Sequence, residues 1–338
     1  MMTARLVLFV AAVVMSAIAG AAGAAGVAGA AGTGGTAAET AWLPASPIRI
    51  LHGFQPGGPP DIVLRRIAAG LEVRLGKAVV VENRPGATGT IAAAGVARAA
   101  PDGHTLLFGV AANLAVAPAM MAPPPYDPAQ AFTPIVEVAR GPYVWIVRAD
   151  SSATSLAGFI DSTRAAPGKL NYASPGIGSV HHLATEMFKQ AAGIHMVHIP
   201  YKTGLYAGLL AGDVQAMFES MPSPLPHLRA GKIRILGVTG ARRLAILPDV
   251  PTFGEQGVPD LDVSSWWGIV GPAGLPAPVV QRLNAEVAAI LAEPEMQATL
   301  AQWGIEASPG TPGEFGAHVR AEAAKWRERV GRFGVKPE

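Results

Sequence analysis

The sequence predicts an α/β protein made of two similar units followed by a helical tail. Short apolar runs alternate with segments of helical periodicity, each unit spans roughly 100 residues, and two long helical patterns close the chain. With 338 residues, the chain is long enough for two units that each bury a core. Half of the residues are hydrophobic and 15% are charged, which excludes a disordered chain.

Residues 1–41 are predicted to be an export segment rather than part of the fold. Arg5 precedes an apolar run from Leu6 to Ala19, which is too short to span a bilayer but has the length of a signal-peptide core. Ala17-Ile18-Ala19 fits a cleavage site, and other Ala/Gly sites up to residue 41 also fit. No later segment is apolar for long enough to cross a membrane, so we expect a soluble protein exported to the periplasm.

The first unit begins with a βαβαβ rhythm, which predicts parallel strands with helices on both faces of a sheet. The predicted elements are strand 48–51, helix 61–75, strand 78–81, helix 90–99, strand 105–110, and strands 134–138 and 143–147. The helix at 61–75 shows the clearest pattern, because its apolar residues recur on one face.

The second unit repeats the α/β rhythm, and the tail is predicted to pack back on the first unit. The predicted elements are helix 155–166, strand 170–173, helix 182–192, strand 196–199, helix 205–211, strand 214–218, helix 225–230, strand 233–238, strand 266–270 and helices 277–291 and 311–330. The chain then crosses between units near Val144 and near Gly240. The first lobe is therefore predicted to comprise residues 46–143 plus 240–338, and the second lobe residues 144–239.

Composition excludes several functions. The net charge is only +2, from 26 basic and 24 acidic residues without a basic stripe, so no nucleic-acid partner is expected. The absence of cysteine excludes disulfides, thiolate metal sites, cysteine nucleophiles and a lipid anchor. Adjacent histidines point about 100° apart on a helix, so His181 and His182 are not expected to share a metal ion. No cofactor is expected, since Gly176-x-Gly178 lacks the rest of a dinucleotide fingerprint.

Each unit carries one glycine-rich turn between a strand and a helix, at 53–61 and at 173–182. A helix N-terminus offers free backbone N–H groups and partial positive charge, and glycine allows an anion to approach them closely. Ligands of open α/β sheets bind at the carboxyl ends of strands, where both turns are predicted to lie. Each turn alone also fits an ordinary strand–helix connection. Together they suggest a pincer around a carboxylate.

An ordered set of segments resembles the Bug family of tripartite tricarboxylate transporter receptors, and the resemblance extends over nearly everything after residue 46. The segments are Pro47-Ile48-Arg49, Pro56-Gly57-Gly58, Val81-Glu82-Asn83-Arg84-Pro85-Gly86-Ala87, Ala100-Pro101-Asp102-Gly103, Tyr126-Asp127-Pro128, Asn171-Tyr172-Ala173-Ser174, Gly176-x-Gly178-Ser179, His182-Leu183, His198-Ile199-Pro200-Tyr201-Lys202, Leu247-Pro248-Asp249-Val250-Pro251-Thr252, Ser265-Trp266-Trp267-Gly268 and Pro272-Ala273-Gly274-Leu275-Pro276.

The resemblance implies a type II periplasmic binding protein fold, with two α/β lobes around a central ligand cleft. It also implies a carboxylate held largely by backbone N–H groups and water, delivery to membrane permease subunits, and a monomer. Carried onto this sequence, the ligand-binding positions are Phe54, Gly57, Gly58, Asp61, Ser174, Gly176, Gly178, Ser179 and His182.

Two further residues are candidates for the cleft. Glu219 stands where the family commonly has Asp, and it either orients a ligand amine or hydroxyl or ends a strand in solvent. Of Trp266 and Trp267, either one ring lines the cleft and the other packs in the core, or both pack in the core, and Trp266 is taken as the cleft residue. Asp61 also favours the positive end of its helix without touching a ligand.

The sequence departs from the family pattern near the expected cleft. Pro60 replaces a common Thr or Ser and so removes a backbone N–H and a hydroxyl from the first turn. Thr88 and Thr203 stand at common glycine positions, and His52 stands at a common apolar strand position. We therefore expect the second lobe to provide most of the carboxylate recognition, with a ligand that cannot be copied from any relative.

The predicted function is a non-enzymatic periplasmic receptor for a small carboxylate, such as a di- or tricarboxylate, an aromatic acid or an amino acid. One alternative is a secreted α/β hydrolase that uses His182 with Ser179, although no G-x-S-x-G motif supports a nucleophile. The other alternative is a ligand-sensing receptor without a transport role.

Overall fold

The computed structural model describes residues 42–201, 203–258 and 261–333, so the predicted export segment lies outside the described residues. Along the first part of the chain the elements are β1 (Ile48–His52), α1 (Pro59–Leu75), β2 (Val79–Asn83), η1 (Ala87–Gly89), α2 (Thr90–Ala97), β3 (Thr105–Val110), η2 (Ala112–Val116), α3 (Ala117–Met120) and β4 (Phe132–Arg148). The remaining elements are α4 (Leu156–Ala165), β5 (Asn171–Ser174), α5 (Val180–Ala192), β6 (Val197–Pro200), α6 (Leu205–Ala211), β7 (Ala216–Ser220), α7 (Leu225–Arg229), β8 (Ile233–Val238), η3 (Gly254–Gln256), β9 (Ser264–Pro272), α8 (Ala277–Leu291), α9 (Pro294–Gln302), β10 (Glu306–Ala307) and α10 (Pro312–Phe333).

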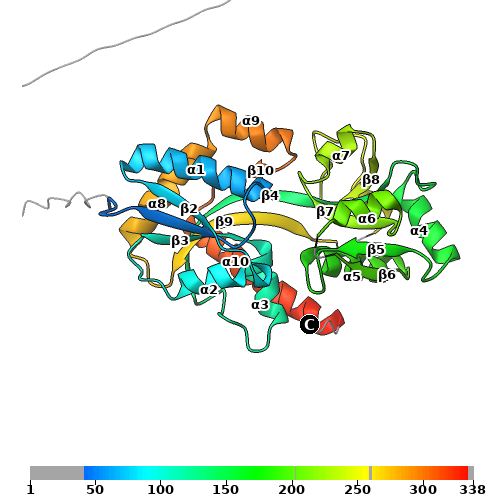
Figure 1. The fold of residues 1–338 in the computed structure, drawn as a ribbon, viewed down its shortest axis with the longest axis horizontal. Helices are drawn as coiled ribbons and strands as arrows, with labels where there is room; N and C mark the ends of the chain where they lie inside the picture. Colours follow the sequence, from blue (N-terminus) through cyan, green and yellow to red (C-terminus); the bar gives the residue numbers. More distant parts are fainter. Residues whose placement is uncertain (1–41, 202, 259–260, 334–338) are drawn as a thin grey trace, which may run out of the picture. The chain divides into compact units, whose positions relative to one another are not determined.

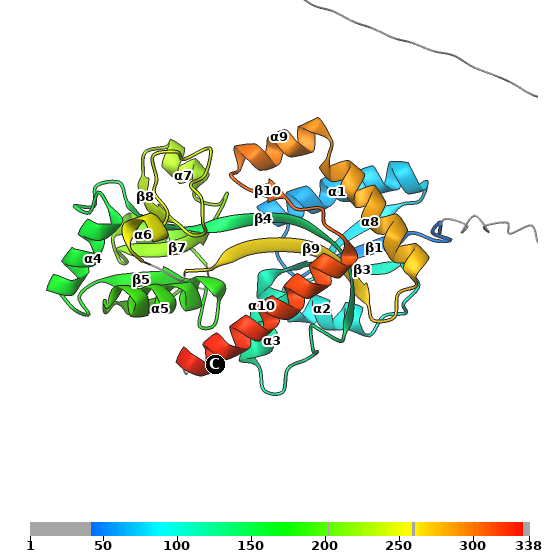
Figure 2. The ribbon, with the colours of Figure 1, turned by 180° about the vertical axis from the view of Figure 1, so that it is seen from behind.

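The strands form one hydrogen-bonded path in the order β2-β1-β3-β9-β4-β7-β5-β6, and β8 and β10 also pair with β4. β1 pairs in parallel with β2 and β3, and β5 pairs in parallel with β6 and β7, as the α/β rhythm predicts. β9 is antiparallel to both β3 and β4. The path therefore consists of two parallel groups joined through antiparallel strands, which Figures 1 and 2 show as the long β4 and β9 at the centre.

β4 differs from the sequence prediction, because it is one strand of 17 residues rather than two short strands. It changes partners in its middle. Pro142 pairs with Ser264 of β9, whereas Tyr143 pairs with Ser220 of β7. Periodicity did not reveal this continuity, because Gly141 and Pro142 read as a strand break.

The segment between β8 and β9 packs beside the second group of strands. The Phe253 ring lies 5.2 Å from Phe188 and 5.4 Å from Phe218, measured between centroids. The Gln256 side chain donates to the Leu236 carbonyl oxygen and accepts from the Leu156 backbone N–H. Residues 253–256 therefore pack against the part of the chain between residues 156 and 236.

Thr239 forms hydrogen bonds at the point where β4, the end of β8 and the start of β9 meet. Its buried hydroxyl accepts a hydrogen bond from the Tyr143 backbone N–H at 2.9 Å and donates one to the Val263 carbonyl oxygen at 2.7 Å. The Thr239 backbone N–H also donates to the Tyr143 carbonyl oxygen. One side chain thus ties the end of β8 and the start of β9 to the point where β4 changes partners.

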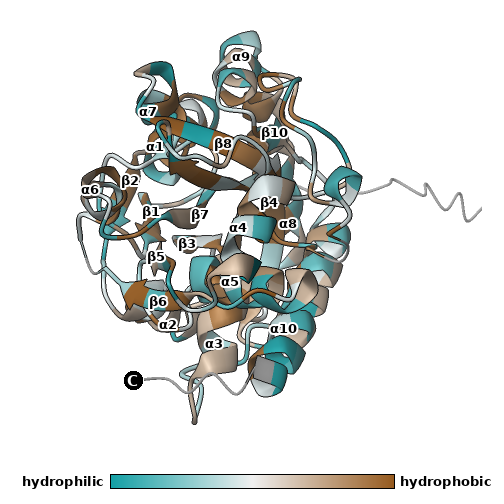
Figure 3. Ribbon diagram, turned by 90° about the vertical axis from the view of Figure 1, so that its right-hand side faces the viewer, coloured by the Kyte–Doolittle hydropathy of each residue, from teal (hydrophilic) through white to brown (hydrophobic). Residues whose placement is uncertain are grey.

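Apolar residues fill the space between strands and helices. Trp145 of β4 is fully buried among aromatic rings, with Phe218 at 4.9 Å and Phe188 at 5.0 Å between centroids. The tail helix α10 contacts β4 and the η2–α3 region, as expected for a tail that packs back on the first unit. In Figure 3 the inner strands are brown, and teal bands lie on outer helices such as α10. No helix in the described ranges has the length and apolarity needed to cross a bilayer.

Replacing Thr239 tests how much this junction contributes to stability. Thr239→Val keeps the shape of the side chain but leaves the Tyr143 N–H and the Val263 carbonyl oxygen without their partner. An unpaired buried polar group costs about 1–3 kcal/mol, so the free energy of unfolding should fall by about 2 kcal/mol in urea titrations. The control Thr154→Val lies at an exposed position and should change stability by less than about 0.5 kcal/mol. Equal stabilities of the two variants would contradict the role of Thr239.

Candidate functional site

A pocket of about 220 Å³ lies where the strand ends of both groups meet. From the first group it is lined by Phe54, Pro59, Pro60, Thr88, Val110, Ala111, Ala112, Val116, Ser265 and Trp267. From the second group it is lined by Tyr143, Pro175, Gly178, Ser179, Val180, His181, Ser220, Met221 and Ser223. Most of these residues follow the carboxyl ends of β1, β2, β3, β5 and β7, where ligands of α/β sheets bind.

In the first turn Phe54 lines the pocket, whereas the acidic residue Asp61 does not. Asp61 is buried and accepts hydrogen bonds from the Gly57 N–H at 3.0 Å, the Arg65 guanidinium at 2.8 Å and the Asn83 amide at 2.8 Å. These bonds fix the turn against β2. The structure therefore places Gly57, Gly58 and Asp61 outside the pocket lining, and Asp61 supports the turn from behind.

Two prolines occupy the start of α1. Pro59 and Pro60 are the first helical residues, after Gly58 as N-cap. Neither has an N–H, so the positive end of this helix presents two pyrrolidine rings to the pocket in place of two donors. The sequence identified this loss at Pro60, and the structure extends it to Pro59.

In the second turn most polar groups bond to one another. The Gly176 N–H donates to the Ser174 hydroxyl, and the Ser179 hydroxyl donates to the Gly176 carbonyl oxygen. The Ser179 hydroxyl also caps α5 by accepting from the His182 N–H. The Gly178 N–H donates to His182 Nδ1 at 3.1 Å. Gly178 and Ser179 line the pocket, whereas Ser174, Gly176 and His182 shape the turn around it.

The free donors at this end of the pocket are the first two backbone N–H groups of α5. Those of Val180 and His181 have no acceptor among the described residues, because the hydrogen bonds of α5 to its preceding turn begin at His182. Both residues line the pocket. A helix N-terminus with unpaired N–H groups and partial positive charge favours an anion.

His182 belongs to a stack of aromatic rings behind the turn. Its ring lies 4.2 Å from His198, which in turn lies 4.9 Å from Tyr172, measured between centroids. Burial, with a smaller contribution from the charge of His182, lowers the pKa of His198 from 6.5 to about 4, and burial also lowers the pKa of His182. His182 is therefore neutral near pH 7, in agreement with its Nδ1 acting as an acceptor.

His181, rather than His182, faces the pocket, and Glu219 holds it. His181 Nε2 lies 3.1 Å from Glu219 Oε1, and the Glu219 side chain is only 9% exposed. The His181 ring meets Tyr143 edge-on at 5.2 Å between centroids. Glu219 also accepts the Ser220 N–H at 2.9 Å, so it lies behind the pocket lining and orients the residues that form it.

Trp266 and Trp267 divide between core and pocket, and Trp267 lines the pocket in place of the expected Trp266. Trp266 is fully buried, and its Nε1 donates to Glu322 of α10, which also accepts from Trp326. Trp267 lines the pocket. The residues alternate across β9, and sequence alone did not fix which face of the strand is inward.

Thr88 enters the pocket from a strained backbone. Ala87 and Thr88 have φ values of 46° and 56°, in the left-handed region that costs an L residue about 1–2 kcal/mol. The loop they belong to also touches the first turn, since a Cβ at Gly53 would lie 2.5 Å from the Gly89 Cα. Strain in a residue that lines a pocket is common at functional sites. The departure of Thr88 from the family pattern was the signal in the sequence for this contact.

The site therefore includes residues that sequence reasoning missed. Of the predicted binding residues, Phe54, Gly178 and Ser179 line the pocket, and the others lie behind it or, for Trp266, in the core. The additional polar residues of the lining are Thr88, Tyr143, His181, Ser220, Ser223 and Ser265. At His181 and Trp267, the local sequence pattern could not decide which of two neighbouring residues lines the pocket.

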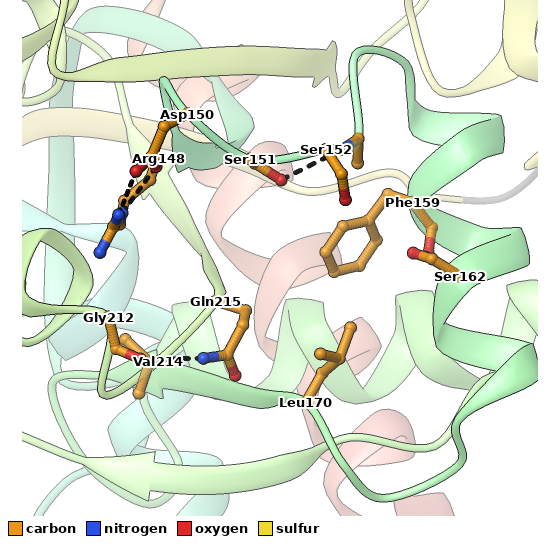
Figure 4. A pocket seen from close by; sticks show the side chains of 11 residues that line it. Arg148, Asp150, Ser151, Ser152, Phe159, Ser162, Leu170, Gly212, Val214 and Gln215 are labelled. Atoms are coloured by element: carbon orange, nitrogen blue, oxygen red, sulfur yellow. Dashed lines mark hydrogen bonds and ion pairs between the residues drawn. The ribbon is translucent and has the colours of Figure 1, made fainter.

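A second pocket lies away from this site, around Arg148 and Phe159 (Figure 4). The Phe159 and Leu170 side chains project into it, and Arg148 is paired with Asp150 at its edge. It is lined only by residues 148–215, so it does not bring the two groups of strands together. No cluster of three or more potential metal ligands occurs among the described residues.

A family model described as "Tripartite tricarboxylate transporter family receptor" matches residues 63–334. Protein BugT of Bordetella pertussis is 33% identical over 296 residues, which cover 87% of this chain and 91% of BugT. These matches confirm the family resemblance found in the sequence motifs.

Solved structures agree with the fold. An R. palustris protein with adipate is 35% identical, has a TM-score of 0.80, and is matched over 87% of this chain and 99% of its own. MatC from Rhodopseudomonas palustris, with bound malate, is 31% identical with a TM-score of 0.76, over 85% of this chain and 100% of its own. The predicted α/β fold of a periplasmic binding protein is thereby confirmed.

The lowered histidine pKa values predict a loss of stability in acid. The pKa values of His182 and His198 lie below 6.5 in the folded chain. As the pH falls below about 6.5, these histidines therefore become protonated in the unfolded chain while they stay neutral in the folded chain. Their contribution is complete above about pH 6.5 and is lost as the pH falls toward 4. His198→Gln should reduce the difference in unfolding free energy between pH 7 and pH 4.5 by on the order of 1 kcal/mol, allowing for partial exposure.

The matched control for this measurement is His195→Gln, at an exposed position near the same strand. Urea titrations at both pH values give the unfolding free energies. A pH dependence of His198→Gln that equals those of the control and the wild type would contradict the role of the buried ring stack.

Proposed function

Because this chain belongs to the tripartite tricarboxylate transporter receptor family, we propose that it captures a small carboxylate in the pocket between its two groups of strands. The observation that supports this most directly is the unpaired N-terminus of α5, because Val180 and His181, whose N–H groups have no acceptor among the described residues, both line the pocket. A carboxylate there accepts charge-assisted hydrogen bonds, which are stronger than those between neutral groups.

Hydroxyl groups near this helix end complete the proposed anion site. Ser220, Ser223 and Ser265 line the pocket and come from β7, the loop after it and β9. A hydroxyl donates to a carboxylate or binds a bridging water. We propose that Phe54 closes the site from the first group, and that Gly57, Gly58, Asp61, Ser174, Gly176, Gly178, Ser179, His182 and Glu219 hold the turns and side chains in place.

We further propose that the chain forms two lobes that close on the ligand. The predicted boundaries were 46–143 plus 240–338 for the first lobe and 144–239 for the second. The packing of Phe253 and the Thr239–Val263 hydrogen bond favour a second crossing near Val263 instead of Gly240. A ligand that touches both lobes stabilises the closed state, because it gains contacts only there.

The proposed partners follow from the family. They are the membrane permease subunits of a tripartite tricarboxylate transporter, which recognise the closed, loaded receptor. We propose a monomer without catalytic activity that reaches the periplasm through cleavage of the signal peptide within residues 1–41. A receptor that only senses its ligand shares the same site, and uptake assays in a strain lacking the permease separate the two roles.

The hydrogen bonds of Ser179 and His182 do not support the alternative that the chain is a hydrolase. The Ser179 hydroxyl donates to the Gly176 carbonyl oxygen and caps α5, and His182 Nδ1 accepts from Gly178. A nucleophile needs a base that accepts its proton. Incubation with ester substrates should therefore yield no turnover, whereas a carboxylate should bind one per chain.

The α5 N-terminus can be tested by removing one N–H group. Val180 is the first helical residue, where proline is tolerated, and the extended Ser179 before it suits a following proline. Val180→Pro should weaken carboxylate binding by about 10- to 150-fold, since a hydrogen bond to a charged group contributes about 1.5–3 kcal/mol. Titration calorimetry with an acid found by thermal-shift screening measures the change.

Val180→Ala is the matched control, because it also loses the valine side chain but keeps the N–H. It should bind within about threefold of the wild type. If the proline and alanine variants bind equally well, the carboxylate does not use the Val180 N–H.

A second test addresses closure of the lobes. Saturation with the same acid should lower the radius of gyration in solution X-ray scattering, because the closed state brings both groups of strands against the ligand. The Val180→Pro variant serves as control and should compact only at correspondingly higher ligand concentration. Full occupancy without compaction would contradict the two-lobe closure.

A further inference from the structure

We propose that the ligand of this receptor is a monocarboxylate with a flat apolar body of aromatic size, and not a di- or tricarboxylate. The inference rests on the proposed carboxylate-binding function and names its ligand class. The observations that support it are the apolar wall of the pocket, its shortage of positive charge and its volume.

The wall that the first group of strands contributes is mostly apolar and carries two aromatic rings. Its apolar residues are Phe54, Pro59, Pro60, Val110, Ala111, Ala112, Val116 and Trp267, and its polar residues are Thr88 and Ser265. The Phe54 ring is itself supported from behind by His52, at 5.4 Å between centroids. Rings and pyrrolidines in this arrangement favour an apolar surface on the ligand, and aromatic pairs add about 0.5–1.5 kcal/mol beyond the burial of area.

The prolines at the start of α1 strengthen this argument. Were the two helix N-termini equivalent, a dicarboxylate could place one carboxylate on each. The first two N–H groups of α5 are unpaired and belong to residues that line the pocket, but α1 begins with Pro59 and Pro60, which have none. The second carboxylate of a dicarboxylate would meet the apolar wall.

The charge of the lining points the same way. Among the described residues that line the pocket, His181 is the sole side chain able to carry positive charge, and none is Lys or Arg. His181 is already paired with the buried Glu219 carboxylate. A second ligand carboxylate would therefore be desolvated without a counter-charge, which is costly in a site of low polarity.

The size of the pocket agrees with a small aromatic acid. The pocket volume is about 220 Å³. That space accommodates an acid with a single ring. In the proposed pose the carboxylate of the acid lies at α5 and the serine hydroxyls, and its ring lies among Tyr143, Phe54 and Trp267, which all line the pocket.

Titration calorimetry with four defined compounds tests the proposal: benzoate, its neutral analogue benzamide, malate and adipate. On the wild-type protein at pH 7, benzoate should bind at least tenfold more tightly than malate or adipate. Benzamide should bind at least tenfold more weakly than benzoate, because it lacks the charge that α5 favours.

Two variants separate the causes. Phe54→Ala should weaken benzoate binding about tenfold by removing the aromatic wall, and Ile62→Ala, at a 46% exposed position on α1 outside the pocket, should leave it unchanged. Pro60→Lys adds a positive charge to the apolar wall and should raise the affinity for malate relative to benzoate at least tenfold. Circular dichroism and melting temperature confirm that each variant is folded.

The outcomes are distinguishable. Tighter binding of malate or adipate than of benzoate by the wild type would overturn the ligand class but support the carboxylate receptor. Binding of benzamide as tight as that of benzoate, or of none of the acids, would overturn both the ligand class and the proposed function. A malate-to-benzoate preference unchanged in Pro60→Lys would overturn the role of charge shortage in selectivity.

Discussion

The continuous strand β4 is the constraint on which the rest of the structure depends. It leaves β9 and joins β7 between Pro142 and Tyr143, so both groups of strands share one backbone at that point. The Thr239 hydroxyl fixes the same point to the other crossing segment at Val263. Because the parallel strands of each group direct their carboxyl ends toward this junction, the turns that follow them must line a common pocket.

The two sides of that pocket use their polar groups differently. In the turn before α5, glycine N–H groups bond to Ser174 and His182, and these bonds hold the turn in shape while the first N–H groups of the helix stay unpaired. In the turn before α1, Asp61 takes up the Gly57 N–H, and prolines follow. The pocket therefore has one end suited to an anion and one suited to an apolar surface, although both ends are strand–turn–helix connections of similar sequence composition.

Most elements could be predicted from the sequence because periodicity and glycine turns mark them locally. α1, α8 and the strands of the second group begin and end within a few residues of the expected positions. The continuity of β4 and the antiparallel position of β9 depend on long-range pairing, which a local pattern does not contain. Local pattern also could not decide whether His181 or His182, and whether Trp266 or Trp267, lines the pocket. A shift of one residue exchanges the buried side chain for the one that faces the pocket. Motif resemblance located both turns but not the side chains that line the space between them.

Two departures of the sequence from the family pattern, Thr88 and Glu219, each carry an energetic cost within the protein itself. Thr88 adopts a left-handed backbone that glycine adopts without strain, and the lining gains a methyl and a hydroxyl in return. Glu219 is buried behind His181, where its desolvation is offset by that imidazole and by the Ser220 N–H. Both features are bonded or strained before any ligand arrives, so the lining residues on each side of the pocket are held in place in advance. A ligand gains affinity to the extent that it matches this prepared arrangement, and the proposed preference for a single carboxylate rests on the absence of Lys and Arg from the described lining.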